Sequence, residues 1–342
     1  MSVGRKGRLA LGGGLALLLL AFFFRGVEWA AIGRAFREAK PAYLVGVLLA
    51  TLATYLLRAW RWGFLLAPIV RVPLPRLFSA TVVGFMAGLV IPRAGEVVRP
   101  YLVARRYGAS TSAAFATIIL ERLFDLLTVV VLFGGYLYLL PHPPSQTEGP
   151  LIGVLKAGGA VAGLGALAIT AVLAAFHSNA ERAMTLFDRL FQRLPERFAR
   201  PLSGALRAFG DGLAVLKAPA GHLLAIAGQS LLTWLAIAAG VHWANLAFGI
   251  ELPFQTAFLI IGFLTVGVAV PTPGMVGGFH ESYKLALTQV YAVAPGPAVA
   301  AGIAAHALNN LPVLLLGLAY LGSEGLTLGR VAAMTDEEGG PS

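Results

Sequence analysis

The sequence predicts an all-α, polytopic integral membrane protein with about six full spans and two re-entrant helical hairpins in an inverted arrangement. Of its 342 residues, 58% are hydrophobic and only 12% are charged, whereas soluble domains carry about 25% charged residues. Long apolar runs recur along the chain, and two shorter ones are interrupted by proline and glycine. Because no stretch has the composition of a soluble domain, residues 1–342 are expected to form a single membrane domain.

Positive charge is in excess, since 26 lysines and arginines stand against 16 acidic residues and give a net charge of +10. In a soluble protein this excess would suggest nucleic acid binding. In a membrane protein it is typical of cytoplasmic loops and of attraction to anionic lipid. We therefore expect contact with membrane phospholipid and no nucleic acid partner. The chain has no cysteine, which excludes disulfides and cysteine-ligated metals.

Full spans are predicted where apolar runs approach the length of about 20 residues that a bilayer requires. They lie near residues 9–24, 41–62, 111–140, 151–176, 222–248 and 297–321. Basic residues precede the first run and no small-residue cleavage site follows it, so we expect an uncleaved span. The loop 142–150, which has no lysine or arginine, would then lie outside. This arrangement predicts a multi-pass protein of the cell (inner) membrane with both termini in the cytoplasm.

Three polar segments are expected outside the bilayer core. Residues 27–40 carry apolar side chains at helical spacing, which indicates an interfacial helix. Residues 178–217 are rich in arginine and predict a cytoplasmic amphipathic helical hairpin, and residues 331–342 predict a disordered tail. Arg58 and Arg61 alternate with tryptophans at the end of a span, which favours a membrane-edge anchor, with a lipid-headgroup contact as the alternative.

Two interrupted segments, 77–107 and 254–293, are predicted to be re-entrant. Each contains an apolar run too short to cross the bilayer, followed by prolines and glycines that cannot continue a helix. Backbone that opens at membrane depth must be covered by protein or line a water-filled cavity, as in the central sites of transporters. The stretch Gly88 to Val97 matches Gly267 to Val276 at glycine, proline, glycine and valine. This match suggests an inverted internal repeat, with chance similarity between glycine-rich segments as the alternative.

Ionisable side chains follow the first break and recur on the next span. The candidate substrate-binding residues here are Arg93, Glu96, Arg99, Glu121, Arg122 and Asp125. The first three are three residues apart, so a helix would align them along one side. Because charge at membrane depth is costly, we favour a functional site, with a structural ion-pair network as the alternative.

Further candidates lie at the second break and on the last span. They are Gly274, Gly277, His280, Glu281, Asn309 and Asn310. Free N–H groups after the glycines could bind an anion such as a lipid phosphate, although the acid in the first helical turn could cap the helix instead. The histidine could titrate near neutral pH or be a hydrogen-bonded structural residue. The asparagines could close a cavity or join helices.

The sequence contains no pattern of a catalytic site. It has no nucleophile with a positioned base, no Walker A motif, no metal-ligand spacing and no dinucleotide-binding loop. We therefore expect no catalytic residues, no cofactor and no metal, and we expect a chain that is not an enzyme.

Three motifs occur in order: Pro92-x-x-Gly95-Glu96-x-x-Arg99, then Glu121-Arg122-x-x-Asp125, then Pro271-x-Pro273-Gly274-x-x-Gly277. In these motifs the chain resembles, over nearly its whole length, the flippase-like membrane domain of the lysylphosphatidylglycerol synthase family. The chain departs from the family pattern at two positions. Met275 stands where the family usually has a second glycine, and His280 stands where it usually has a glutamate. Glu281 follows one residue late, which turns a helical side chain by about 100°.

The resemblance implies movement of a lipid between leaflets. In full-length synthases this membrane domain is followed by a soluble aminoacyl-transferring domain, which we do not expect here because the chain ends after its last span. Our first hypothesis is a flippase-like transporter of a phospholipid, with an aminoacylated one included. Its arginines would hold the lipid phosphate, and its acids would hold the arginines or recognise a cationic headgroup. The alternative is a membrane enzyme or subunit of a lipid or polyprenyl-phosphate glycan pathway, with a partner synthase or a homo-oligomer.

Overall fold

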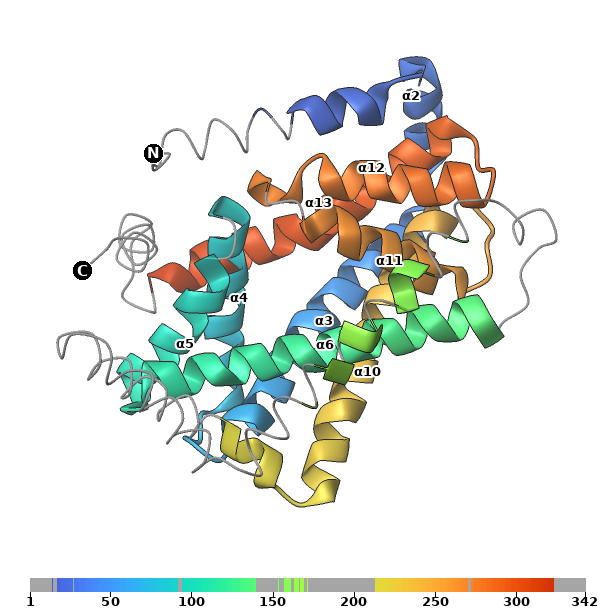
Figure 1. The fold of residues 1–342 in the computed structure, drawn as a ribbon. Helices are drawn as coiled ribbons and strands as arrows, with labels where there is room; N and C mark the ends of the chain where they lie inside the picture. The colour runs from blue at the N-terminus through green and yellow to red at the C-terminus, as the bar shows by residue number, and fades with distance from the viewer. Residues whose placement is uncertain are drawn as a thin grey trace, which may run out of the picture.

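The computed structural model describes residues 17–26, 28–91, 94–139, 213–269 and 272–322, together with scattered positions at 14 and between 153 and 171. Within these ranges the fold is a bundle of helices without strands (Figure 1). The α-helices are α2 (Trp29–Glu38), α3 (Pro41–Leu66), α4 (Leu74–Val90), α5 (Ala94–Tyr107), α6 (Thr111–Leu139), α10 (Ala220–Ala247), α11 (Thr256–Ala269), α12 (Gly278–Leu285) and α13 (Pro295–Leu321). Short helical turns are η2 (Leu213–Lys217), η3 (Pro273–Met275) and η4 (Ala286–Val290).

Three helices in the described part of the chain are long and apolar enough to cross a membrane, namely α3, α10 and α13. They correspond to three of the expected spans, and α6, with 29 residues, corresponds to a fourth. Their outward side chains suit lipid rather than water. Leu49 on α3 and Leu315 on α13, for example, are 59% and 65% exposed. Most of the other two expected spans, the segments 142–150 and 331–342, and residues 178–212 of the expected cytoplasmic hairpin lie outside the described residues.

Two helix–break–helix hairpins occur where the sequence is interrupted, α4–α5 and α11–α12. Each closes on a pair of glycines eleven residues apart, Gly84 with Gly95 and Gly267 with Gly278. A Cβ on Gly95 would run into the carbonyl of Gly84, and a Cβ on Gly278 would run into the carbonyl of Gly267. Only glycine allows the two backbones of a hairpin to approach so closely.

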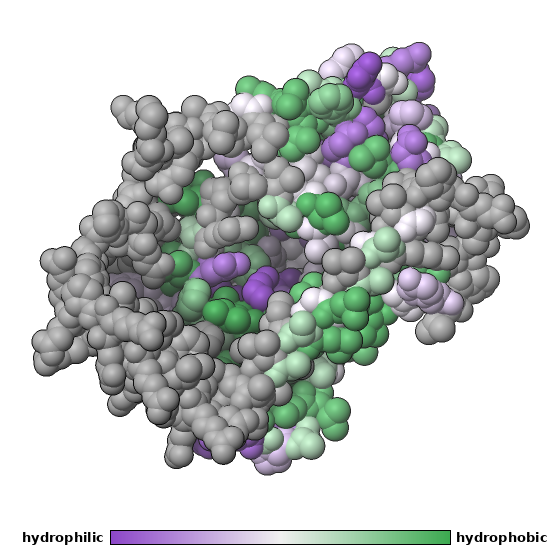
Figure 2. All heavy atoms as spheres, in the orientation of Figure 1, coloured by the Kyte–Doolittle hydropathy of each residue, from purple (hydrophilic) through white to green (hydrophobic). Residues whose placement is uncertain are grey.

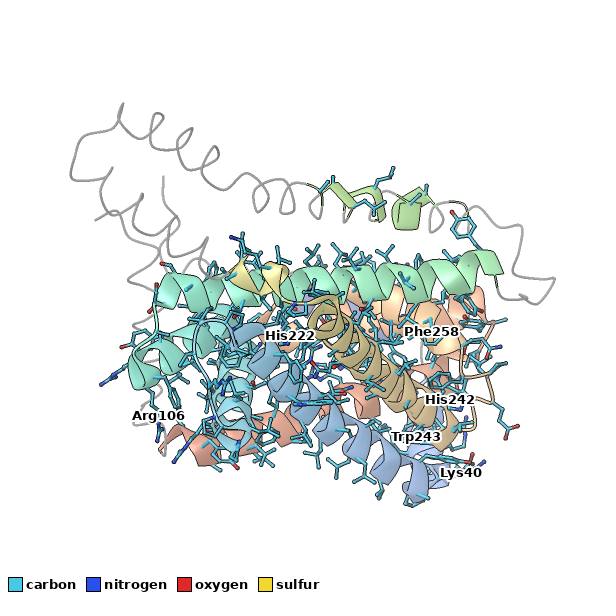
Figure 3. All side chains as sticks on the ribbon, turned by 90° about the horizontal axis from the view of Figure 1, so that it is seen from below. Lys40, Arg106, His222, His242, Trp243 and Phe258 are labelled. Atoms are coloured by element: carbon cyan, nitrogen blue, oxygen red, sulfur yellow. The ribbon has the colours of Figure 1, made fainter. Side chains whose placement is uncertain are left out.

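The contacts between helices repeat in two halves of the fold, in which α3, α4, α5 and α6 correspond to α10, α11, α12 and α13 in that order. We call this correspondence the two-fold exchange. Helix α5 packs on α6 as α12 packs on α13, and α4 packs on α13 as α11 packs on α6. Helices α3 and α10 run side by side at the centre of this exchange, where Trp243 of α10 covers Gly46 of α3 (Figure 3). In Figure 1 the hairpin α4–α5 lies to the left of the hairpin α11–α12, and the two meet where η3, at the second break, contacts α4.

The glycine pairs define a different register from the one expected from the sequence. Gly267 corresponds to Gly84 in this packing, whereas the sequence match aligned it with Gly88. The difference of four residues is about one turn of helix. An apolar helix shifted by one turn presents nearly the same sequence pattern, so the sequence match alone does not distinguish the two registers.

Candidate functional site

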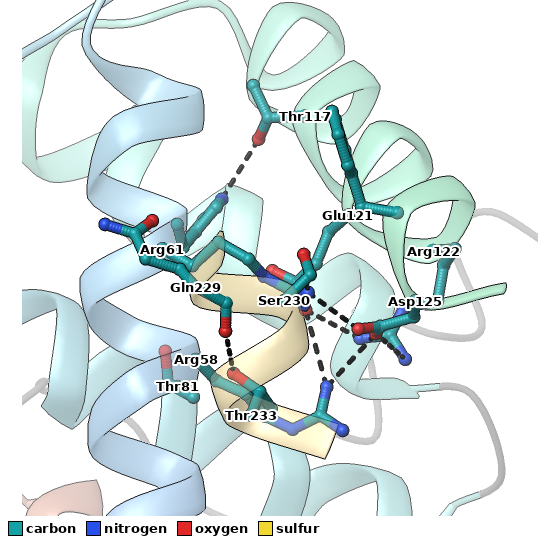
Figure 4. A network of polar contacts seen from close by, with 12 residues as sticks. Arg58, Arg61, Thr81, Thr117, Glu121, Arg122, Asp125, Gln229, Ser230 and Thr233 are labelled. Carbon is teal, nitrogen blue, oxygen red and sulfur yellow. Dashed lines mark hydrogen bonds and ion pairs between the residues drawn. The ribbon is translucent and has the colours of Figure 1, made fainter. Parts of the chain in front are cut away.

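A buried ionic network joins α3, α5 and α6 (Figure 4). Its members are Arg58 and Arg61 of α3, Arg99 of α5, and Glu121, Arg122 and Asp125 of α6. The spacing of three or four residues within α3 and α6 places the facing groups on one side of each helix. Gly84 of α4 contributes indirectly, because a Cβ at this position would collide with the side chain of Arg99.

The carboxylate of Asp125 is the centre of one half of the network. Arg61 Nη1 lies 2.7 Å from one of its oxygens and Arg58 Nη1 lies 3.2 Å from the other. The indole of Trp234 on α10 donates a hydrogen bond to it at 2.9 Å. Arg61 also donates to the hydroxyl of Ser230 at 2.7 Å, so α10 holds both members of this ion pair.

The carboxylate of Glu121 is the centre of the other half and is fully buried. Arg99 binds both of its oxygens, at 3.0 and 3.1 Å, in the paired geometry that suits a guanidinium group. Arg122 donates to one of these oxygens at 2.7 Å, and Arg61 lies 3.5 Å away. Arg99 also stacks on the ring of Trp62, with 4.5 Å between its guanidinium carbon and the ring centroid.

Positive charge exceeds negative charge in this network. Four guanidinium groups face two carboxylates within the network, and Glu96, which lines the pocket beside Arg122, offsets one of the two positive charges that remain. Buried charges are stable only when they are paired and hydrogen-bonded. The Nε atoms of Arg61, Arg99 and Arg122 are buried without a hydrogen-bond partner in the described structure. The network is therefore electropositive and has unused donors.

A pocket of about 330 Å³ lies beside the network, between the two hairpins. Glu96, Arg99 and Arg122 line it from the first half of the chain, and Thr272 and Asn310 line it from the second. The side chain of Arg122 is 41% exposed, whereas the side chains of the other network members are buried. The space-filling view shows hydrophilic surface at the bottom of a hollow near the centre of the molecule, beside apolar surface (Figure 2).

The structure brings together most candidates from the first break. Glu96, Arg99 and Arg122 line the pocket, while Glu121 and Asp125 hold the arginines from behind. Arg93 lies outside the described residues.

The candidates from the last span are divided. Asn310 lines the pocket, and its amide nitrogen donates to the carbonyl of His306 at 2.9 Å. Asn309 instead accepts a hydrogen bond from the hydroxyl of Thr51 on α3 at 3.1 Å. Asn309 therefore joins helices, which is the structural alternative that the sequence left open.

Gly274 and Gly277 form the turn after the second break, with φ of 62° and 88°. His306 of α13 donates a hydrogen bond to the carbonyl of Gly274 at 2.8 Å and so holds this turn against the bundle. His280 accepts a hydrogen bond from the amide of Gly277 at 3.4 Å, and its ring lies 4.4 Å from that of His306. The Gly277 amide at the start of α12 is thus used by the side chain of His280 from the same helix.

Glu281 points to a different partner, because its carboxylate lies 3.3 Å from Lys284 Nζ. Lys284 in turn donates to the carbonyls of Phe22 and Phe23 at 2.8 and 2.9 Å. These carbonyls end the described helical residues 17–24, so α12 fastens the first expected span to the bundle. Neither Glu281 nor His280 is among the residues that line the pocket.

Sequence reasoning missed two arginines and one hydroxyl. Arg58 and Arg61 were expected at a membrane edge, but their side chains are 9% and 0% exposed and belong to the network. Thr272, between the two prolines of the second break, lines the pocket. The spacing of the arginines, three residues apart on a long apolar helix, is the signal that could have found them.

The family model described as "Lysylphosphatidylglycerol synthase TM region" matches residues 9–317. A curated relative named "Glycosyltransferase AglD", from Haloferax volcanii, is 25% identical in an alignment that covers 92% of this chain and 54% of the relative. The chain thus spans about half the length of this relative. This comparison corrects the expectation that the chain is not an enzyme, because the relative bears the name of an enzyme. The match over residues 9–317 shows that this multi-pass membrane protein belongs to the family of the lysylphosphatidylglycerol synthase TM region.

Proposed function

We propose that the pocket binds the phosphate of a lipid headgroup and that the protein moves this headgroup between the two leaflets. The observation that carries the proposal is the excess of positive charge beside a pocket that both halves of the fold line. A guanidinium group forms paired hydrogen bonds with phosphate oxygens, and Arg122 is the exposed member that a ligand can reach. An anion placed there would restore the charge balance of the network.

The break in each hairpin supports a path for the headgroup through the bilayer core. Helices α4 and α11 have 17 and 14 residues, or about 25 and 21 Å at the rise of an α-helix, against about 30 Å of hydrocarbon. We propose that both hairpins are re-entrant and enter from opposite sides, as the two-fold exchange of helix contacts suggests. Both termini would then lie in the cytoplasm, and the membrane would be the cell (inner) membrane.

Translocation in liposomes tests the proposal. Purified protein is reconstituted with a fluorescent phospholipid, and the fraction of label that an external quencher can reach is followed over time. We expect wild type to equilibrate the label, Arg122→Gln to slow this strongly, and Arg105→Gln at the exposed end of α5 to leave it unchanged. Equal rates for the wild type and the Arg122 variant would contradict the role of the pocket.

Cysteine accessibility tests the membrane arrangement. Because the chain contains no cysteine, single cysteines can be introduced without removing native ones. A cysteine in η3 and a cysteine at the start of α5 should each react with a small water-soluble reagent from one side of the membrane only. The reactive side should differ between the two positions. Reaction of both positions from the same side would contradict opposite entry.

A second candidate function is favoured by the named relative. A chain that resembles a glycosyltransferase over 92% of its own length could act in a glycan pathway, with the same pocket holding a lipid phosphate. In such a reaction a glycosyl group would pass from a nucleotide sugar to an oxygen of the lipid phosphate, and the nucleotide would leave. Purified protein with polyprenyl phosphate and radiolabelled nucleotide sugars tests this directly, and label in the lipid fraction would favour the enzyme over the transporter.

A further inference from the structure

We infer that the pocket selects a net-anionic headgroup that carries hydroxyl groups, such as a polyol phosphate or a sugar phosphate, and discriminates against headgroups with an ammonium group. This inference rests on the proposed function and names the class of headgroup. It follows from the charge around the pocket, from the use of the nearby aromatic rings, and from the polar groups that have no partner.

Charge around the pocket disfavours an ammonium group. The network has two positive charges in excess, and Glu96 at the pocket wall offsets only one of them. The phosphate of a zwitterionic headgroup neutralises the same amount of positive charge as the phosphate of an anionic lipid. The ammonium group of the zwitterionic headgroup then adds a positive charge back. Like charges a few ångströms apart repel each other, and the repulsion is stronger inside a pocket than in water because the local dielectric is lower.

Two aromatic rings at or beside the pocket already face guanidinium groups, and a third, Tyr55 in the pocket lining, packs edge-on with Phe85 at 5.3 Å between ring centroids. The ring of Phe85, which lines the pocket, has Arg58 at 5.3 Å and Arg99 at 5.4 Å from its centroid. Arg99 also covers Trp62. An aromatic cage for a quaternary or primary amine needs free ring faces, and Phe85 and Trp62 already serve arginines of the protein.

The remaining polar groups suit a ligand with hydroxyls. Thr272 is 3% exposed, lines the pocket, and its hydroxyl is buried without a hydrogen-bond partner in the described structure. A buried hydroxyl without a partner is costly, so its presence at a pocket wall points to a ligand. The amide nitrogen of Asn310 is used within α13, which leaves its oxygen for a ligand. Glu96 also offers only acceptors when it is ionised.

The positions of these groups orient the ligand. Arg99 and Arg122 come from the first half of the fold, and Thr272 and Asn310 come from the second. With the phosphate at the arginines, the hydroxyls of the headgroup reach the turn at the second break. One headgroup would therefore bridge the two hairpins.

Binding of two short-chain lipids with identical acyl chains tests the inference. Phosphatidylglycerol is anionic and carries two hydroxyls, and phosphatidylethanolamine carries an ammonium group. We expect the purified protein to bind the first at least tenfold more tightly, as measured by the lipid concentration that raises its unfolding temperature. Thr272→Val should weaken phosphatidylglycerol binding by roughly tenfold, the effect of one lost hydrogen bond to a buried partner, and Thr272→Ser should restore it.

Two controls separate the interpretations. Thr265→Val removes a hydroxyl that bonds within α11 and lies outside the pocket lining, so it should leave binding unchanged. Glu96→Gln keeps an acceptor but removes a negative charge from the pocket wall, so it should strengthen phosphatidylglycerol binding. The inference would be overturned if wild type bound phosphatidylethanolamine as tightly as phosphatidylglycerol and the Glu96 variant lost phosphatidylethanolamine binding. The proposed function would still stand.

Failure of the proposed function has a different signature. If neither lipid binds, or if soluble glycerol 3-phosphate protects the protein as well as the lipid does, a lipid headgroup is not the ligand. The second result would still support a hydroxylated phosphate as the chemistry that the pocket recognises.

Discussion

Asp125 of α6 and Asn309 of α13 occupy corresponding positions in the two halves of the fold. Each is the fifteenth residue of its helix, counted from Thr111 and Pro295. Each accepts a hydrogen bond from the central helix pair, Asp125 from Trp234 at 2.9 Å and Asn309 from Thr51 at 3.1 Å. The backbone arrangement is thus repeated, while the charge is confined to one half. We therefore expect that removing the Asp125 carboxylate and removing the Asn309 amide lower the free energy of unfolding by different amounts.

Replacing the carboxylate by an amide should destabilise the fold strongly. Asp125→Asn can keep the bond from Trp234, but it removes the nearer counter-charge of Arg61 and Arg58 and leaves them only the longer contacts with Glu121. Removing one partner of a buried ion pair costs about 3–5 kcal/mol, whereas Asn309→Ala should cost about 1 kcal/mol, as for one hydrogen bond. Free energies of unfolding in detergent, measured by denaturant titration, provide the comparison. Equal costs would show that the charge of Asp125 does not stabilise the fold.

Adding a methyl group at the glycine crossing should separate the helices of a hairpin. Gly95→Ala and Gly278→Ala each place a Cβ against a backbone carbonyl of the partner helix, which cannot rotate away. We expect a loss of about 1–3 kcal/mol, typical of overpacking. Gly240→Ala in α10 is the control, because its Cβ would meet Ala50 at 3.6 Å, an ordinary contact. That control should be neutral or stabilising, and a loss as large as at the crossings would contradict the packing argument.

Met275 should carry backbone strain. Its φ of 58° lies in the left-handed region, which costs a non-glycine residue about 1–2 kcal/mol. Met275→Gly and Met275→Ala both remove the side chain, but only glycine removes the Cβ. We therefore expect the glycine variant to be more stable than the alanine variant by about 1 kcal/mol in thermal or denaturant unfolding. A more stable alanine variant would show that the turn relaxes on substitution.

Lys284 should fasten the first helix to α12. Its ammonium group bonds the carbonyls of Phe22 and Phe23, and Glu281 neutralises it. In Lys284→Met these carbonyls lose their donor, so hydrogen exchange of the amides in residues 17–24 should become faster. Lys217→Met, at an exposed position in η2, should leave this exchange unchanged. Unchanged exchange in the Lys284 variant would show that apolar packing alone holds the helix.

Much of the architecture could be predicted from apolar run lengths and from proline and glycine. The long helices α3, α6, α10 and α13 lie close to the predicted spans, and both breaks occur between predicted helical runs. The cluster Glu121, Arg122 and Asp125 was also predicted, because charge in an apolar run is unusual enough to be noticed in a single sequence.

The partners of these charges could not be predicted in the same way. Arg58 and Arg61 stand beside tryptophans at the end of an apolar run, which is also the pattern of a membrane-edge anchor. Their burial depends on α6 and α10 packing across α3, so residues 169 apart in the chain, Arg61 and Ser230, come into contact. His280 was a candidate because of its position after the glycines, and the fold turns its ring toward Phe23 and His306.

The sequence by itself determined that the chain is a helical membrane protein, where its helices break, and that charge is concentrated near one break. These properties depend on local composition, because hydrocarbon requires apolar residues and closed backbone hydrogen bonds in each segment. Only the tertiary structure decided which charges pair, that positive charge is in excess beside the pocket, and that Thr272 lines the same pocket as Arg122. These relationships join distant parts of the chain, and they depend on helix packing that no single segment specifies.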